Sequence, residues 1–290
     1  MTRKTFLITG ISSGFGSAFA RAALDAGHIV VGTARSQAAC DAFEALMPRR
    51  AKAVLLDVTD FDAIEPAIVV VEREVGGIDV LVNNAGYGHE GVLEESPLSE
   101  LRRQFDVNVF GAVAIIKAVL PGMRQRRAGH IVNVTSMGGY VTMPGIAYYC
   151  GSKFALEGIS EVLAKEVASL NIKVTAVAPG SFRTDWAGRS MVRSERSIAD
   201  YDSLFDPIRK AREDKSGRQA GDPARAAQAL LQIVDAVYPP VHLLLGSDAL
   251  KLVRDKLDAL GAEITAWTDL TVSTDFVEAS AAMDAPARVG

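Results

Sequence analysis

Two side chains four residues apart, Tyr149 and Lys153, are the strongest candidates for chemistry in this sequence. Positions i and i+4 lie on one face of an α-helix, so the lysine ammonium can sit beside the tyrosine ring. A free phenol has a pKa of about 10 and transfers protons poorly at neutral pH, whereas a neighbouring cation favours the phenolate and lowers that pKa. We therefore predict that Tyr149 is a general acid and base whose pKa is lowered by Lys153.

Ser136 lies thirteen residues before Tyr149, at the end of a short β-branched run. Its hydroxyl suits a hydrogen bond to a substrate oxygen on which charge develops. Reducing a ketone requires a proton at oxygen while hydride reaches carbon, so these groups suit a hydride-transferring oxidoreductase. Tyr148 is a poorer candidate, because it is rotated by about 100° around the helix and its i+4 partner is Ser152.

A glycine-rich turn follows the first apolar run and precedes a helical pattern. Glycines allow a tight turn and close approach of the backbone to a pyrophosphate, and the helix N-terminus adds free N–H groups and a positive dipole. The spacing is Gly-x-x-x-Gly-x-Gly, and no Gly-Lys-Ser/Thr follows, which excludes a P-loop. We therefore predict dinucleotide binding at this turn. The predicted contacts are Gly10, Ser12, Ser13, Gly14, Phe15 and Gly16.

The second apolar run ends in Thr33-Ala34-Arg35-Ser36, without an acidic residue. An NAD site usually places Asp or Glu there to bind the adenosine ribose 2′-hydroxyl, whereas an arginine accommodates a 2′-phosphate. Arg35 can make a forked contact to phosphate, and Ser36 can add a donor. The sequence therefore favours NADP(H), with NAD(H) left open.

The elements that must position these groups alternate along the chain. Seven short apolar runs, largely continuous, are typical of parallel strands buried on both faces, and segments long enough for crossover helices separate them. This predicts an α/β fold: a Rossmann-like, doubly wound parallel sheet of about seven strands with helices on both faces. The predicted strands are Phe6–Thr9, Ile29–Thr33, Ala53–Asp57, Val80–Asn83, His130–Thr135, Val174–Ala178 and Val241–Leu245. The predicted helices are Ser17–Ala26, Gln37–Met47, Phe61–Val75, Leu98–Arg126, Ala147–Leu170 and Pro223–Tyr238.

Two segments depart from this pattern, and since no repeat or linker is evident we assign residues 1–290 to a single domain. Residues 181–221 contain no predicted strand and follow a strand at the edge where open α/β sheets bind ligands, so we expect a lid over the substrate. Residues 248–290 are predicted to form one helix, from Asp248 to about Asp269, and a polar tail that frays. The lid's apolar side chains, which suggest a partly hydrophobic substrate, are Phe182, Trp186, Met191, Tyr201 and Phe205.

Together these features resemble the short-chain dehydrogenase/reductase family over roughly Lys4–Gly246. In chain order the motifs are the glycine-rich turn, Asp57-Val58, Asn83-Asn84-Ala85-Gly86, Asn108, Ser136, Tyr149 with Lys153, and Pro179-Gly180 with Thr184. The resemblance implies an NAD(P)-dependent enzyme acting on CH–OH groups. It also implies that Lys153 binds the nicotinamide ribose and that Asn108 holds a water in a proton relay. The cofactor contacts it adds are Asp57, Val58, Asn84, Ala85, Gly86, Tyr149, Lys153, Pro179, Gly180 and Thr184.

The resemblance also indicates a branch of the family and an oligomeric state. Ser273-Thr274-Asp275-Phe276, near the C-terminus, is similar to the hydroxysteroid-dehydrogenase-like branch. Relatives pair through the helices that correspond to those holding Asn108 and Tyr149. The resemblance therefore implies a homodimer or homotetramer.

Two other functions could use the same fold. A nucleotide-sensing regulator that had lost the chemistry would carry a damaged catalytic tetrad, yet Asn108, Ser136, Tyr149 and Lys153 are all present. An epimerase or dehydratase of nucleotide-linked sugars usually has a larger C-terminal substrate domain than the 45 residues after Leu245. We therefore favour reduction of a ketone, or oxidation of a secondary alcohol, and keep the regulator as the alternative.

Composition narrows the partners and the compartment. The formal net charge of −4 gives no basic footprint for nucleic acid or for an anionic membrane. The best membrane-span candidate, residues 107–120, is shorter than about 20 residues and contains Asn108 and Lys117. The two cysteines lack metal-ligand spacing, so we expect no metal site and a cytoplasmic protein whose partner is a small ketone or alcohol.

Other aromatic and histidine residues near the strand ends are assigned lesser roles. Tyr87 and Tyr140 are expected to shape the pocket, and His89 is interpreted as a solvated loop residue. His28, His130 and His242 precede or open strands and are interpreted as structural.

Overall fold

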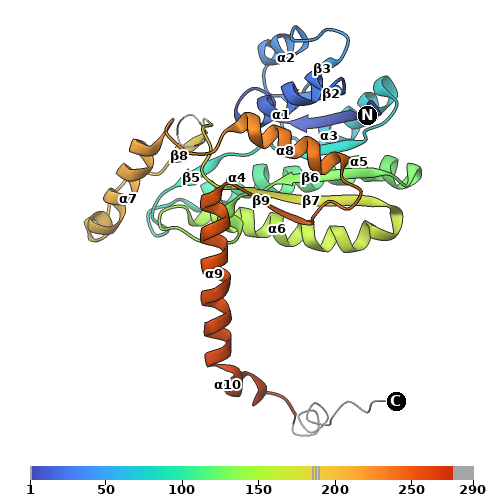
Figure 1. Cartoon of the computed structure of the whole chain (residues 1–290). Helices are drawn as coiled ribbons and strands as arrows, with labels where there is room; N and C mark the ends of the chain where they lie inside the picture. The colour runs from blue at the N-terminus through green and yellow to red at the C-terminus, as the bar shows by residue number, and fades with distance from the viewer. Residues whose placement is uncertain (1, 185, 187, 189, 277–290) are drawn as a thin grey trace, which may run out of the picture.

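The structure, a computed structural model, describes residues 2–184, 186, 188 and 190–276. Its centre is a seven-stranded sheet in which every pair is parallel, with the order β3-β2-β1-β4-β6-β7-β9 (Figure 1). This confirms the predicted α/β, Rossmann-like fold. The strands are β1 Thr5–Thr9, β2 Ile29–Ala34, β3 Ala51–Leu55, β4 Val80–Asn83, β6 Gly129–Val134, β7 Ile172–Pro179 and β9 His242–Leu245.

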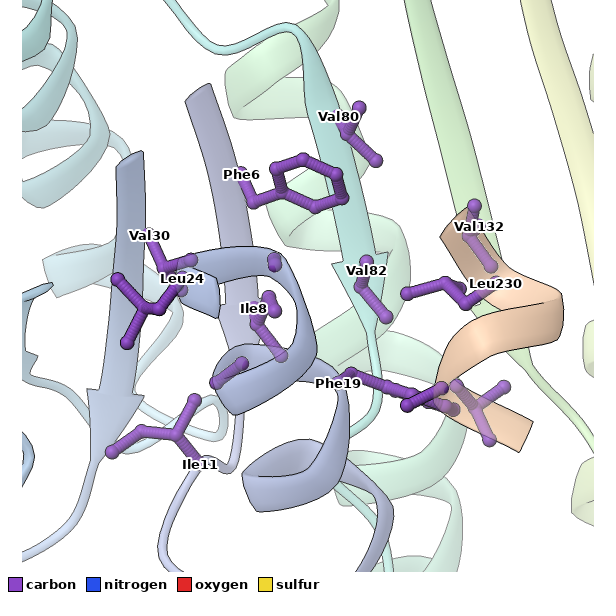
Figure 2. Close-up of a cluster of buried hydrophobic side chains, with 14 of the residues drawn as sticks. Phe6, Ile8, Ile11, Phe19, Leu24, Val30, Val80, Val82, Val132 and Leu230 are labelled. Carbon is purple, nitrogen blue, oxygen red and sulfur yellow. The ribbon is translucent and has the colours of Figure 1, made fainter. Parts of the chain in front are cut away.

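Helices cover both faces of this sheet, as doubly wound topology requires. One face is covered by α1 Gly14–Asp25, α2 Gln37–Glu44 and α8 Pro223–Asp235. The other is covered by α3 Phe61–Val75, α5 Gly111–Arg126 and α6 Ala147–Val167. Figure 2 shows the first of these cores, where Phe6 and Val82 of the sheet face Phe19 of α1 and Leu230 of α8.

The continuous apolar runs follow directly from this burial. Each central strand packs helices on both faces, so both sets of alternating side chains are apolar, and all five residues of β1 are buried. The strand order reverses between β1 and β4, since β1 connects to β2 on one side and β4 begins the other half. Ligands of open α/β sheets bind at the carboxyl ends of the strands beside such a reversal.

The long predicted helix after β4 contains an irregularity. The run Leu98–Arg126 consists of α4 Leu98–Phe105, a π-helical segment Asp106–Phe110, and α5. It is also the one helix among the described residues that is long and apolar enough to cross a membrane. Its side chains Ile115, Val119 and Met123 are buried in the core beneath the sheet, which accounts for the apolar face of α5.

The lid segment contains a strand, so the prediction that residues 181–221 lack one is wrong. β8 Met191–Arg193 pairs in parallel with β5 Gly88–Glu90 and forms a second, two-stranded sheet. Three residues are too few to show a periodic pattern, and the partner lies about a hundred residues earlier in the chain. A helix, α7 Asp202–Lys215, forms a further part of the same segment.

The C-terminal segment also differs in detail. The predicted single helix is two helices, α9 Ser247–Ala266 and α10 Thr268–Val272. In Figure 1, α9 projects away from the sheet and its covering helices. The predicted frayed tail lies largely outside the described residues, which end at position 276.

Candidate active site

A cavity of about 1100 Å³ lies at the carboxyl ends of the central strands. Its wall brings together seventeen of the predicted site residues, which come from nearly every strand end of the sheet. Gly16, Ser36 and Asn108 are not in its wall. The predicted residues that line it are Gly10, Ser12, Ser13, Gly14, Phe15, Arg35, Asp57, Val58, Asn84, Ala85, Gly86, Ser136, Tyr149, Lys153, Pro179, Gly180 and Thr184.

The glycine-rich turn presents the N-terminus of α1 to this cavity. Gly10 and Gly14 have φ values of 71° and 53°, in the left-handed region that favours glycine. Among the described residues no side chain caps the helix at Ser13, and the first turn carries no acidic residue. The free N–H groups and the positive end of the helix therefore face the cavity uncompensated, which fits the pyrophosphate of a dinucleotide.

Gly16 does not touch the cavity but sets the position of α1. A Cβ at this position would lie 2.2 Å from the Gly10 carbonyl oxygen and 2.5 Å from Asn84 Nδ2. Those distances are well inside van der Waals contact, so only glycine lets the helix approach the turn this closely.

Asn84, which follows β4, joins this strand to the end of β1. Its Nδ2 donates to the carbonyl oxygens of Thr9 and Gly10 at 2.9 and 3.1 Å. In return, Thr9 Oγ1 accepts hydrogen bonds from the backbone N–H groups of Asn84 and Ala85. These bonds hold the cavity floor beside the glycine-rich turn.

The residues after β2 and β3 form one end of the cavity, opposite the end that contains Tyr149. Arg35 lines the wall, is exposed, and has no hydrogen-bond or ion-pair partner within the part of the chain that the structure describes. Ser36 instead caps α2, accepting from Ala39 N–H at 3.4 Å. Asp57 Oδ1 accepts hydrogen bonds from the N–H and the hydroxyl of Thr59, which fixes its carboxylate at the cavity edge.

The predicted catalytic side chains meet at the other end. Ser136, Tyr149 and Lys153 are buried, with 6–8% of each residue exposed. Lys153 Nζ lies 5.7 Å from the centre of the Tyr149 ring and donates to the Val134 carbonyl oxygen at 2.8 Å. Ser136 Oγ accepts from the Gly138 N–H at 3.0 Å. The i, i+4 geometry expected on α6 is therefore present.

The expected electrostatic effect of this pair is wrong for the protein alone. Burial raises the pKa of Tyr149 to about 12, although a hydrogen bond with the Ser136 side chain opposes the rise. Burial also lowers the pKa of Lys153 to about 8, against the attraction of the Glu157 carboxylate. Desolvation is the largest cause of both shifts, so the tyrosine is held as the neutral phenol.

Asn108 lies in the π-helical segment and is almost fully buried. Its Oδ1 accepts from the Tyr87 N–H, and its Nδ2 donates to the Tyr87 carbonyl and to Ser152 Oγ, all at 3.1 Å. It thereby links the strand that follows Gly86 to the helix of Tyr149. The relay role implied by the resemblance stays a prediction.

Tyr148 and His89 form a separate buried pair. Tyr148 donates its hydroxyl to the Ser96 carbonyl at 2.7 Å and stacks on the His89 ring, with centroids 5.0 Å apart. His89 Nε2 lies 2.9 Å from Ser194 Oγ. The interpretation of His89 as solvated is wrong, because it is only 1% exposed within β5.

The two tyrosines expected to shape the pocket behave differently. Tyr87 lines the cavity, and its hydroxyl is buried with no hydrogen-bond partner in the described residues. Tyr140 is outside the wall; its hydroxyl donates to Glu157 Oε2 at 2.8 Å.

The lid supplies much of the wall opposite Tyr149. Trp186 packs on the Tyr149 ring with centroids 5.0 Å apart, and its buried indole N–H has no partner among the described residues. Several other residues of this wall are not predicted from the sequence. The i, i+3, i+4, i+7 spacing on α7 and the position of the connection between Ser136 and Tyr149 are the signals that indicate most of them. They include Met143, Pro144, Ile146, Ser190, Val192, Ile208, Ala211, Arg212, Lys215 and Gln219.

A buried carboxylate fastens the lid to the fold. Glu90 of β5 has a side chain that is 1% exposed and lies between three arginines of the lid. Arg193 Nε is 3.2 Å from Oε1, Arg209 Nε is 3.5 Å from Oε1, and Arg212 Nη1 is 2.9 Å from Oε2. Arg212 also donates to the Pro144 carbonyl at 2.6 Å, so the wall of the cavity depends on this cluster.

Comparison with known proteins agrees with this geometry. A model of the short chain dehydrogenase family matches residues 4–193, more than half of the chain. The chain is 37% identical over 275 residues to the oxidoreductase BOA17 of Botryotinia fuckeliana, a match covering 93% of this chain and 99% of the relative. It is 37% identical over 247 residues to a 3-ketodihydrosphingosine reductase of Bacteroides thetaiotaomicron, covering 85% and 89%. The crystal structure of a short-chain dehydrogenase from Streptomyces avermitilis is similar with a TM-score of 0.89 at 42% identity, covering 94% of this chain and 99% of that one.

Proposed function

The chain belongs to the short-chain dehydrogenase family and is an oxidoreductase, and we propose that it transfers hydride between NADP(H) and a ketone or secondary alcohol, with Tyr149 as the general acid and base. One observation carries this proposal. Tyr149, Ser136 and Lys153 line the same cavity as the uncapped N-terminus of α1. A dinucleotide whose pyrophosphate lies at that terminus would extend along the cavity toward the phenol. The non-catalytic regulator is not favoured, because the reactive groups are intact.

The chain's own residues perform the proton chemistry. When bound, the cofactor supplies or accepts the hydride, and its oxidised ring carries a positive charge. Tyr149 donates its hydroxyl proton to the substrate oxygen during reduction, and the Ser136 hydroxyl holds that oxygen as charge develops. A Tyr149 pKa of about 12 keeps the phenol protonated at neutral pH, which is the form that ketone reduction requires. Lys153, fixed by the Val134 carbonyl, places its ammonium near the phenolate that results.

The cofactor proposal rests on the end of β2. Arg35 lines the cavity without a partner among the described residues, and no acidic side chain follows β2 to bind a 2′-hydroxyl. An unpaired guanidinium there suits the 2′-phosphate of NADP(H).

We propose a partly hydrophobic ketone as the substrate. The wall around Tyr149 is formed largely by apolar side chains, among them Met143, Ile146 and Trp186. The similarity to a 3-ketodihydrosphingosine reductase makes long-chain ketones a natural part of the panel to be tested.

The proposed assembly is a homodimer or homotetramer that pairs through α5 and α6, in the cytoplasm. Phe110, which precedes α5, and Phe154 and Val162 of α6 are 52, 42 and 54% exposed, a concentration of large apolar side chains that pairing would cover. The free, buried cysteines Cys40 and Cys150 suit a reducing compartment.

Replacing Tyr149 with Phe tests the catalytic assignment. NADPH oxidation over a panel of steroids, cyclic diketones and aliphatic or long-chain ketones should fall by roughly 100-fold or more for Tyr149→Phe, because the proton donor is lost. NADPH binding, measured by fluorescence titration, should stay nearly unchanged. Tyr148→Phe is the matched control: it loses a hydrogen bond to Ser96 but no cavity group, so turnover should persist. Substantial turnover by Tyr149→Phe would refute the assignment.

Replacing Arg35 with Ser tests the cofactor assignment. The wild-type protein should bind NADPH more tightly than NADH, and Arg35→Ser should weaken NADPH binding by roughly 10- to 100-fold while NADH binding changes little. Arg49→Ser, at an exposed arginine outside the cavity, is the control. Tighter binding of NADH by the wild-type protein would contradict the proposal.

A further inference from the structure

The helix α9 leaves the body of the protein after its first two turns. Its buried residues are Ala249 and Val253, and every residue from 254 to 276 is exposed. Figure 1 shows the rest of α9, and α10 after it, projecting from the sheet and its covering helices. An isolated helix of this length is marginal in water unless packing covers an apolar face.

The exposed part of α9 carries such a face. Apolar residues recur at alternating intervals of three and four, which is the a and d spacing of a heptad repeat. Leu257, Ile264 and Trp267 are 54, 61 and 61% exposed, although their kind is usually buried. The exposed residues of this seam are Leu250, Leu257, Leu260, Ile264 and Trp267, while Val253, at the same spacing, is buried against the body of the protein.

The charges beside the seam differ between the two halves of α9. Residues 247–256 comprise three basic and two acidic side chains, whereas residues 257–266 comprise two acidic side chains and none basic. Two copies of α9 placed antiparallel therefore set a basic half against an acidic half, while a parallel pair sets like charges together. Lys256 and Glu263 occupy the positions that flank the seam in successive heptads.

We propose that α9 pairs antiparallel with α9 of a second copy of this chain. The heptad spacing sets Leu257 against the partner subunit's Leu260, and Lys256 beside the partner subunit's Glu263. This contact is separate from the α5 and α6 surface proposed above.

The native mass tests the pairing with adjacent substitutions. Ile264→Lys places a charge in the seam, whereas Thr265→Lys places the same charge beside it on the exposed side. By light scattering after size-exclusion chromatography, Ile264→Lys should halve the native mass of the full-length protein and Thr265→Lys should leave it unchanged. Circular dichroism and thermal unfolding of both variants check that the body is folded. An unchanged mass for folded Ile264→Lys overturns the proposal.

Charge exchange tests the identity of the partner. Lys256→Glu and Glu263→Lys should each shift the association equilibrium toward the smaller species, because each sets like charges together across the antiparallel pair. The double variant, Lys256→Glu with Glu263→Lys, should restore the wild-type mass. Failure of the double variant to recover would contradict pairing between two copies in this register.

Cysteine cross-linking tests the orientation. Leu257→Cys and Leu260→Cys proteins mixed under mild oxidation should form a heterodimeric disulfide, because antiparallel pairing sets these positions opposite each other. If each variant forms a disulfide only with itself, and mixing gives no further product, the pair is parallel and the antiparallel pairing is refuted.

A lipid surface is the alternative partner of the seam, and cosedimentation with phosphatidylcholine–phosphatidylglycerol vesicles tests it. Vesicle binding that Ile264→Lys abolishes without any change in native mass would assign the seam to a lipid surface instead.

Discussion

At the scale of single residues, the proposed catalytic pair of Tyr149 and Lys153 is followed on α6 by a third side chain. Tyr149, Lys153 and Glu157 follow one another at intervals of four and so share one helix face. Glu157 is 6% exposed, and its carboxylate accepts hydrogen bonds from the hydroxyls of Thr135 and Tyr140 and lies 2.9 Å from His242 Nδ1. This fixed negative charge holds the pKa of Lys153 above the value that burial alone would give. Glu157 is therefore a positioning residue: its carboxylate stabilises the Lys153 ammonium beside the Tyr149 ring.

Glu157→Gln should change the pH dependence of the reaction more than its rate at neutral pH. Removing the carboxylate lowers the pKa of Lys153 further below about 8, so the ammonium is lost at lower pH and the alkaline limb of kcat moves toward neutrality. We expect activity near pH 6.5 to be nearly retained and activity near pH 8.5 to fall several-fold relative to the wild-type protein. Glu161→Gln, at an exposed residue paired with Lys165, is the control. If the pH profile of kcat is the same for Glu157→Gln and the wild-type protein, the Glu157 carboxylate does not affect the pKa of Lys153.

At the scale of elements, the site depends on how closely α1 approaches the end of β1. The helix N-terminus reaches the cavity only because Gly16 has no side chain between α1 and the turn. The hydrogen bonds from Asn84 to Thr9 and Gly10 then hold the turn against β4. The lid is held to β5 by another set of contacts between elements, the ion pairs of its three arginines with Glu90.

Gly16→Ala should therefore weaken NADPH binding strongly while the sheet still folds. The added Cβ would meet the Gly10 carbonyl at 2.2 Å, so the turn or α1 must shift. We expect a loss of stability of roughly 1–3 kcal/mol and much weaker NADPH binding. Gly158→Ala in α6 meets no atom within 4 Å and should be neutral or stabilising by up to roughly 1 kcal/mol. Urea unfolding and cofactor titration of both variants provide the comparison, and wild-type binding by Gly16→Ala would contradict this account of the turn.

At the scale of the whole molecule, three of the four histidines are buried in the fold. Burial lowers the pKa of His28, of His89 and of His130, the last to about 4. The native state therefore keeps these rings neutral at pH values where the unfolded chain protonates them. Stability contributed in this way is complete above about pH 6.5 and is lost progressively as the pH falls toward 4.

His130 should account for a measurable share of this acid sensitivity. At pH 5 its ring is protonated in the unfolded chain but still neutral in the native state, a difference of roughly 2 kcal/mol. The free energy of unfolding by urea should thus fall less between pH 7.5 and pH 5 for His130→Gln than for the wild-type protein. The comparison between the two pH values removes any constant effect of the substitution. An equal fall in both proteins would rule out His130 as a contributor.

The sequence alone determined the fold and the main chemical groups. Strands buried on both faces are largely apolar along their whole length, so the seven runs predicted the sheet and its strand ends. The glycine-rich turn and the spacing of Tyr149 and Lys153 are local features whose geometry follows from a turn and a helix. The glycine-rich turn, Tyr149 and Lys153 all line the cavity as expected, apart from Gly16 of the turn.

The tertiary structure decided what depends on distant contacts. The pKa of Tyr149 rises because elements from across the chain bury the phenol, and this effect outweighs the hydrogen bond with the Ser136 side chain. The strand β8, the lid cluster around Glu90 and the contacts of Glu157 join residues separated by about twenty to more than a hundred positions. Local periodicity reports whether a residue is buried, whereas its partners are set by how the elements pack, and the chemistry of this site depends on both.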